Sequence, residues 1–403
     1  MRKGRPDERP FLNWLRGMDL NHRPSGYEPD ELPDCSTPRR AFPTIAPQRA
    51  AVKCAKIRLM AEISAAVRGL PKVQLHCHLE GTVRADTFRE LAARHGVQSA
   101  RAAGPSDQTY AFATFREFLL TFAEVCKTLR SPEDFARIAR DYVAQALAQN
   151  VRYAELFISP SVWTFFHKDL DVHEVVAAMR AALDEGRPKG LEVAFICDLT
   201  RNFGVERAQR TAEIAVALAE AGLGVVGVGL GGDEANFPAQ DYREPFDYAR
   251  SHGLHCVAHA GEAAGPESVW AAIDVLKAER IGHGVRSMED PHLVEALARR
   301  RIPLELCPTS NRLTGAVPAD QVHPIGAFAD AGVLCAIDAD DPELFSTTLC
   351  DEYALAEKWL GWSGLVARAH DAVTASFLPV ATKIALSSEI DEFCTDIAGG
   401  PPN

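Results

Sequence analysis

The sequence predicts an α/β fold, a (β/α)8 barrel of the TIM type with extra helices inserted after the first strand. From Met60 onward, short β-rich segments alternate with helical segments. This alternation favours parallel strands joined by right-handed crossovers. There are eight β-rich segments, the strand number of a closed barrel. Ionisable residues follow most of them, where such a barrel places its active site.

In chain order, the expected strands cover residues 73–78, 153–158, 192–197, 225–230, 256–259, 280–282, 303–307 and 333–337. Segments rich in Ala, Leu, Glu and Arg, such as 205–221 and 291–301, are the expected helices between them. The stretch between the first two strands is too long for one crossover. We expect it to hold extra helices at 114–128 and 132–149 that cap the barrel mouth.

Residues 1–59 differ from the rest of the chain. They are rich in proline and carry a net positive charge, whereas the whole chain carries −12. No helical or strand period runs through residues 21–47, so we predict a disordered extension. Residues 18–35 resemble a string that precedes unrelated bacterial proteins through misassigned start sites, and we hypothesise that translation begins at Met60. Residues 60–403 are then expected to form a single domain.

The composition bounds the partners and the compartment. A net charge of −12 argues against a nucleic-acid-binding face, which would be basic. No uncharged apolar run is long enough to cross a membrane, and no secretory signal opens the chain. The ten cysteines form no C-x-x-C pair, which favours free thiols in a reducing compartment. We expect a cytoplasmic protein with a small-molecule substrate; the sequence does not indicate its oligomeric state.

Histidines and an aspartate at strand ends predict a metal site. His76 and His78 are two residues apart on the first expected strand, so their imidazoles point the same way. His259 ends the fifth strand and Asp340 follows the eighth. Three imidazoles and one carboxylate suit a zinc ion with an open position for water.

Three further residues have the chemistry to move protons at such a site. His283 follows the sixth strand and is a candidate base. Glu262 lies three residues after His259, and Gly261 would let the backbone bring its carboxyl beside the metal. Asp341 adjoins Asp340; one of the two can bind the metal while the other accepts a hydrogen bond from the bound hydroxide.

The motifs that carry these residues occur in a distinctive order. They are LHCHLEG at 75–81, GGDE at 231–234, HAGE at 259–262, GHG at 282–284, CPTSN at 307–311 and DDP at 340–342. In this order, across residues 70–350, they resemble the adenosine deaminase family of metal-dependent adenosine, adenine and AMP aminohydrolases, and among these the bacterial adenosine deaminases.

The resemblance implies a role for each residue. One zinc ion per chain would be held by His76, His78, His259 and Asp340. Glu262 would protonate the purine ring nitrogen beside the amino-bearing carbon, His283 would orient or deprotonate the water, and Asp341 would fix the hydroxide. Substrate contacts would come from His78, Glu80, Gly232 and Asp341, with Gly232 using its backbone. The expected reaction is hydrolysis of adenosine or 2′-deoxyadenosine to inosine-type product and ammonia.

Two features of the sequence bear on the substrate, and the first departs from the family pattern. Position 80 is Glu, where adenosine-specific members usually carry an Asp that contacts the ribose. The stretch from Gly232 to Glu234 keeps the nucleoside pattern, which favours adenosine; adenine or aminodeoxyfutalosine is the alternative. Asp338 replaces a usual Asn, and the sequence leaves open whether it is a hydrogen-bond acceptor near the site or a buried, protonated carboxyl.

Rival functions lack their defining residues. A cytidine-deaminase-like site needs P-C-x-x-C, which is absent. Two-metal hydrolases on this barrel often carry a bridging carboxylated lysine at the end of strand four, and none stands there. A mononuclear amidohydrolase of other specificity and a non-catalytic barrel are the remaining, weaker alternatives.

Overall fold

Eight parallel strands form one sheet, and their spatial order follows the sequence. The computed structural model describes residues 63–99, 110, 112 and 114–398; the predicted extension at 1–59 lies outside them. The strands are β1 (Lys72–His78), β2 (Val151–Ile158), β3 (Glu192–Asp198), β4 (Val225–Gly229), β5 (His255–Ala260), β6 (Arg280–His283), β7 (Leu304–Leu306) and β8 (Cys335–Ile337). All eight expected strands are confirmed, with ends shifted by at most a few residues.

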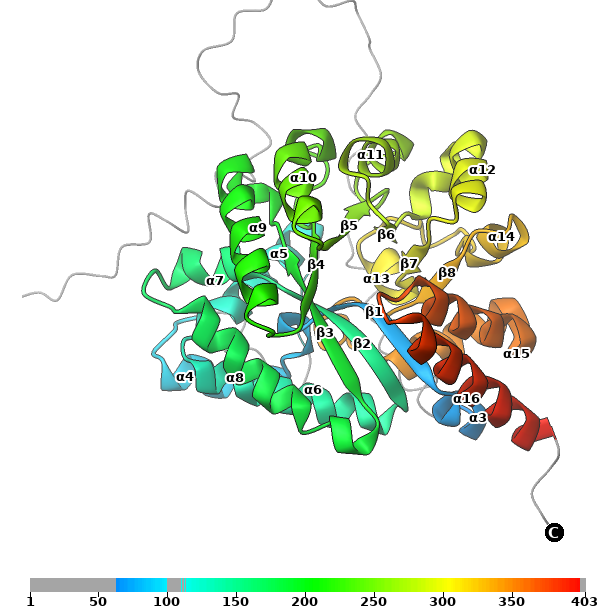
Figure 1. The fold of residues 1–403 in the computed structure, drawn as a ribbon, viewed down its shortest axis with the longest axis horizontal. Helices are drawn as coiled ribbons and strands as arrows, with labels where there is room; N and C mark the ends of the chain where they lie inside the picture. Colours follow the sequence, from blue (N-terminus) through cyan, green and yellow to red (C-terminus); the bar gives the residue numbers. More distant parts are fainter. Residues whose placement is uncertain (1–62, 100–109, 111, 113, 399–403) are drawn as a thin grey trace, which may run out of the picture.

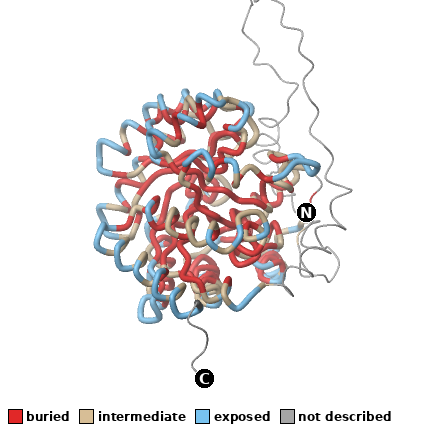
Figure 2. The backbone as a smooth tube through the Cα atoms, turned by 90° about the vertical axis from the view of Figure 1, so that its right-hand side faces the viewer, coloured by how far each residue is buried: buried red, intermediate tan, exposed pale blue. Residues whose placement is uncertain are grey.

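Helices surround the strands on the outside of this barrel (Figure 1). They are α3 (Ala65–Gly69), α4 (Ala85–Arg94), α5 (Phe115–Thr128), α6 (Pro132–Ala148), α7 (Pro160–Phe166), α8 (Val172–Asp184), α9 (Val205–Glu220), α10 (Arg243–Ser251), α11 (Pro266–Ala271), α12 (Pro291–Arg300), α13 (Pro308–Leu313), α14 (Ile325–Asp330), α15 (Leu349–Ala375) and α16 (Val380–Ala398). Buried residues fill the interior, while exposed residues lie along the outer helices (Figure 2). Within the described residues, no helix combines the length and apolar character that crossing a bilayer requires.

The two predicted helices after β1 form as α5 and α6, and local capping explains where they begin. The Thr114 side chain accepts the Glu117 amide at the start of α5. Ser131 and Asp134 form a reciprocal capping box at the start of α6, next to a proline in its first turn. Helix α5 lines the cavity at the barrel mouth, as expected, whereas α6 packs against α8 and β2 and contributes no residue to that cavity.

The barrel closes between β1 and the residues that follow β8. The His78 amide donates to the Asp340 carbonyl at 2.9 Å, and the Asp340 amide donates to the His76 carbonyl at 3.0 Å. These bonds form a parallel bridge between Cys77 and Asp340. The backbone contact that closes the barrel therefore also sets three of the predicted metal ligands side by side.

Asp338 strengthens the same seam. One of its carboxylate oxygens, Oδ1, accepts the Leu75 amide at 2.7 Å and the His76 amide at 3.0 Å. Burial raises the pKa of Asp338 to about 7. Its side chain thus takes the place of a strand carbonyl opposite β1, and the structure assigns it a role in closing the barrel.

Candidate active site

The four predicted metal ligands meet at the barrel mouth. His76 and His78 come from β1, His259 from β5, and Asp340 from the segment after β8; one ligand atom from each lies within 4.8 Å of the others. The Nε2 atoms of His78 and His259 are 3.2 Å apart. Oδ1 of Asp340 lies 3.4 Å from Nε2 of His76 and 3.5 Å from Nε2 of His78.

These donors fit a divalent transition metal. Nε2 of His76 is buried and has no hydrogen-bond partner among the described residues. Burial lowers the pKa of His78 to about 3, and burial together with the neighbouring histidines lowers that of His259 well below its usual value. Neutral imidazoles with converging lone pairs are the form in which histidine binds metal. A cation would satisfy all of these groups at once.

The imidazole of His76 is held from behind by buried charges. Oε2 of Glu305 lies 2.7 Å from Nδ1 of His76. Glu305 is paired in turn with Arg280 at 2.6 Å, and Arg280 also pairs with Glu155 at 2.6 Å. A carboxylate that accepts the Nδ1 proton leaves Nε2 free as a ligand and makes the ring more basic. None of the sequence motifs indicates this support.

Asp340, and not Asp341, joins the ligand cluster. Its backbone has a φ of 61°, a left-handed conformation that costs a non-glycine residue free energy. Ser310 donates its hydroxyl to Oδ2 of Asp340 at 2.6 Å, which leaves Oδ1 facing the histidines.

Asp341 lines the cavity beside the ligands. Its Oδ1 is buried without a hydrogen-bond partner among the described residues. Burial and the adjacent Asp340 carboxylate raise the pKa of Asp341 well above its usual value. A side chain at Gly81 would collide with Asp341, since an added Cβ would stand 2.0 Å from Oδ1.

Glu262 stands on a tightly held loop after β5. Oε1 of Glu234 accepts the Gly261 amide at 2.6 Å. Its other oxygen, Oε2, accepts the amides of Glu262, Ala263 and Ala264 at 2.6–3.0 Å. Gly261 has a φ of 71°, which confirms the expected tight turn. Burial, with the charges of Asp340 and Glu234, raises the pKa of Glu262 to about 8.

His283 is the last member of a chain of hydrogen bonds. A backbone amide at the start of the chain fixes which atom donates in each bond. The Ile325 amide donates to Nδ1 of His323 at 3.3 Å, so Nε2 of His323 carries the proton and donates to Oδ1 of Asn311 at 3.1 Å. The Asn311 amide nitrogen then donates to Nδ1 of His283 at 3.0 Å. Neutral His283 therefore carries its proton on Nε2, which faces Oε2 of Glu262 at 3.5 Å.

Two of the predicted substrate contacts, Gly232 and Glu80, differ in their position relative to the cavity. Gly232 lines the cavity with a φ of 96°, and an added Cβ would stand 2.3 Å from Oδ1 of Asn202. Glu80 is absent from the cavity wall and is 1% exposed. Its Oε1 accepts the Ser159 amide at 2.9 Å and Nε1 of Trp163 at 2.8 Å.

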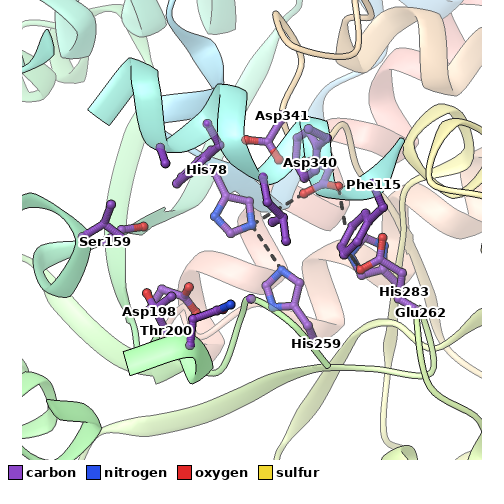
Figure 3. A pocket seen from close by; sticks show the side chains of 17 residues that line it. His78, Phe115, Ser159, Asp198, Thr200, His259, Glu262, His283, Asp340 and Asp341 are labelled. Atoms are coloured by element: carbon purple, nitrogen blue, oxygen red, sulfur yellow. Dashed lines mark hydrogen bonds and ion pairs between the residues drawn. The ribbon is translucent and has the colours of Figure 1, made fainter. Parts of the chain in front are cut away.

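The cavity lies between two sets of polar groups. Figure 3 shows Asp198, Thr200 and Ser159 on one side of His78 and His259. Glu262 and His283 lie on the other side. Apolar side chains of α5, among them Phe115 and Phe122, line the same cavity. Its volume is about 80 Å³. This space suits a small flat molecule reached by both polar sets.

Sequence reasoning missed three groups that support the site: Glu234, the Asn311–His323 pair and Glu305. Glu234 and Asn311 lie inside the quoted motifs, which was the available signal, yet no role was inferred for them. His323 lies outside these motifs, but it is buried and linked to His283 through Asn311.

Known proteins are similar to this chain in both sequence and fold. A family model described as adenosine deaminase matches residues 71–393. The chain is 38% identical over 335 residues to an aminodeoxyfutalosine deaminase of Streptomyces avermitilis, which covers 81% of this chain and 92% of that protein. It is also 38% identical over 317 residues to an adenine deaminase of Streptomyces coelicolor, covering 78% of this chain and 92% of the relative.

A solved structure agrees with this assignment. The zinc-bound amidohydrolase of Burkholderia ambifaria superimposes with a TM-score of 0.74 at 26% identity, covering 84% of this chain and 96% of that one. The family model spans most of the chain, and both sequence relatives align along nearly their full length. The chain therefore belongs to the adenosine deaminase family, whose members are hydrolases of C–N bonds.

Proposed function

We propose that this protein hydrolyses the exocyclic C6–N bond of a 6-aminopurine, releasing ammonia and leaving a 6-oxopurine. The observation that carries the proposal is the convergence of three imidazoles and a carboxylate beside a glutamic acid with a raised pKa. A hydrolytic deaminase needs both a nucleophile from water and an acid for the ring, and this site offers residues for each.

We propose one zinc ion per chain, held by His76, His78, His259 and Asp340. Three imidazoles and one carboxylate suit zinc better than magnesium or calcium, and a related amidohydrolase contains bound zinc. When bound, such an ion supplies a hydroxide nucleophile near neutral pH by lowering the pKa of water to about 7.

Glu262 is proposed as the acid. With a pKa of about 8 it keeps its proton at neutral pH. Donation to N1 of the purine neutralises the charge that develops on the ring as C6 is attacked. Glu234 accepts four backbone amide hydrogen bonds from the loop that carries Glu262. These bonds keep the loop rigid, so the Glu262 carboxyl is oriented before the reaction begins.

His283 and Asp341 are proposed to share the handling of the attacking water. Since Nε2 of neutral His283 already bears a proton, that nitrogen acts as a hydrogen-bond donor and orients the nucleophile. This favours the orienting role over the role of base. The Oδ1 atom of Asp341 is unpartnered among the described residues and lines the cavity, so it is placed to accept a hydrogen bond from the attacking water.

The relatives bear on the substrate. Those described above are named for aminodeoxyfutalosine and adenine, so we place these two 6-aminopurines ahead of adenosine, the substrate expected from the sequence. Gly232 is proposed to let its backbone approach the purine. Glu80 is proposed to act through Ser159, whose amide it holds and which lines the cavity, and not by touching a sugar.

The compartment and partners are proposed on the same basis. The described cysteines are all free, which fits the expected reducing cytoplasm. The partner is proposed to be a small purine, and not nucleic acid.

The test is an ammonia-release screen on the purified protein with adenine, aminodeoxyfutalosine, adenosine and 2′-deoxyadenosine, with zinc quantified on the same sample. We expect release from at least one of the first two at about one zinc per chain. Protein with full zinc content that releases ammonia from none of the four would contradict the proposed function.

A further inference from the structure

Asp198 presents an unused acceptor to the cavity. It ends β3 at the barrel mouth, is 4% exposed and lines the cavity. Its Oδ1 is buried and has no hydrogen-bond partner among the described residues. The carboxylate is held by the Gly231 amide, while burial raises the pKa of Asp198 to about 7. No role for this residue follows from the metal site or from the proton transfers described above.

Asn202 presents an unused donor beside it. Its Oδ1 accepts the Asp233 amide at 3.0 Å, which fixes the orientation of the side-chain amide. The nitrogen, Nδ2, is then buried without an acceptor among the described residues, and Asn202 also lines the cavity. A buried polar atom left without a partner is destabilising, because its hydrogen bonds to water are lost and not replaced. One acceptor and one donor at the same end of a cavity indicate a ligand edge with the complementary pair.

Two glycines keep this end of the cavity open. A Cβ at Gly231 would stand 2.6 Å from Oδ2 of Asp198, and one at Gly232 would stand 2.3 Å from Oδ1 of Asn202. Any side chain at either position would displace the polar pair. The Gly231–Gly232 turn and the two polar residues therefore form one continuous wall.

This wall faces the proposed acid across the cavity, since Asp198 and Glu262 lie on opposite sides of the histidines (Figure 3). In a purine, N1 is para to C4, and C4 carries N9 and adjoins N3. A ring that receives a proton from Glu262 at N1 therefore directs its N3–N9 edge toward the opposite wall. In adenine that edge bears one donor, N9–H, and one acceptor, N3.

We propose that Asp198 accepts N9–H and that Asn202 donates to N3, so that this pair selects free adenine over N9-substituted purines. The inference rests on the proposed function and names its substrate. A ribosyl group at N9 removes the proton that Asp198 would accept and leaves the buried carboxylate unpaired. Sites built around such a hydrogen bond can reject analogues that lack it by about 10⁴-fold.

The test compares adenine, 9-methyladenine and adenosine as substrates of the zinc-loaded wild type and of Asp198→Asn. In the variant, the Gly231 amide takes the side-chain oxygen, so the new NH₂ group meets N9–H donor to donor. We expect the wild type to favour adenine over 9-methyladenine by at least about 100-fold in kcat/KM, and the variant to lose most of that preference. Asp171→Asn, at an exposed helix cap, is the matched control and should keep the wild-type ratio.

A binding measurement separates this inference from the chemistry. Calorimetric titration with hypoxanthine and 9-methylhypoxanthine should show tight binding of hypoxanthine alone by the wild type, and loss of that difference in Asp198→Asn. A variant that loses activity selectively on adenosine would show that Asp198 binds a sugar hydroxyl, and would overturn the proposal. Equal losses on all three substrates would assign Asp198 a purely structural role. Absence of ammonia from every purine would refute the proposed function, and the titration would still decide the role of Asp198.

Discussion

Asn311 places its amide nitrogen 3.0 Å from Nδ1 of His283 and so determines which nitrogen of that imidazole carries the proton. The direction of the bond derives from the Ile325 backbone amide, which can only donate, through His323. The hydrogen-bond chain thus fixes the tautomer of neutral His283, which residue identity alone left open.

Replacing Asn311 with Asp should reverse this bond. The new carboxylate would accept a proton from Nδ1 and favour the tautomer or charge state that His283 now avoids. We expect kcat to fall by at least about 10²-fold, with a shifted pH–rate profile and an altered ¹⁵N spectrum of His283. Unchanged nitrogen shifts in Asn311→Asp would refute the assigned tautomer.

Replacing Glu234 with Gln should loosen the loop that carries Glu262. The side-chain NH₂ of Gln cannot accept the amides that Oε1 or Oε2 now accepts, so buried donors lose their partners. We expect about 2–3 kcal/mol less stability against urea and a lower kcat, with zinc content unchanged. Wild-type stability and activity in Glu234→Gln would show that these hydrogen bonds are dispensable.

Replacing Glu262 with Gln tests the acid directly. The amide cannot deliver a proton to the ring, so turnover should drop by at least about 10²-fold while zinc is retained. Glu267→Gln, an exposed neighbour on the same side of the barrel, serves as the control. Near-normal turnover in Glu262→Gln would remove this residue from the mechanism.

Replacing His259 with Ala removes one ligand of the proposed zinc ion. We expect zinc affinity to fall by at least about 100-fold and the melting temperature to lose its dependence on added zinc. Elemental analysis after dialysis against a chelator measures the first effect and calorimetry the second. The exposed His252 offers a matched His→Ala control. Full retention of zinc in His259→Ala would disprove the ligand set.

The metal-free protein should lose stability as the pH rises from about 6.5 to 8. Burial raises the pKa of Glu80, Asp198 and Glu352 to about 7, so the folded state holds protons that the unfolded state has released. Each such proton contributes a slope of up to about −1.4 kcal/mol per pH unit. Buried histidines with lowered pKa values act in the opposite direction, but only below about pH 6.5.

Urea unfolding across this range checks the sign. The Glu352→Gln variant should show a shallower decline, because it removes one of the titrating carboxyls. Stability that increases with pH between 6.5 and 8 would contradict the raised pKa values.

The barrel and the four residues that converge at its mouth could be predicted from the sequence. Alternating β-rich and helical segments predict parallel strands, and the period of two along a strand places His76 and His78 on one face. Strand ends in a barrel share one rim, so His259 and Asp340 could be assigned to the same site before any coordinates were known. Local sequence patterns were sufficient for these predictions, because each prediction depends on residues adjacent in the chain or on the closure common to all such barrels.

The groups that hold and orient those residues could be identified only from the folded structure. Glu80 seemed suited to a sugar, but it turns away from the cavity to Ser159 and Trp163. The unpaired oxygen of Asp198 and the proton position on His283 depend on partners brought together from other strands and loops. Hydrogen bonds form over about 3 Å between side chains that are remote in sequence, and only the folded packing sets those distances.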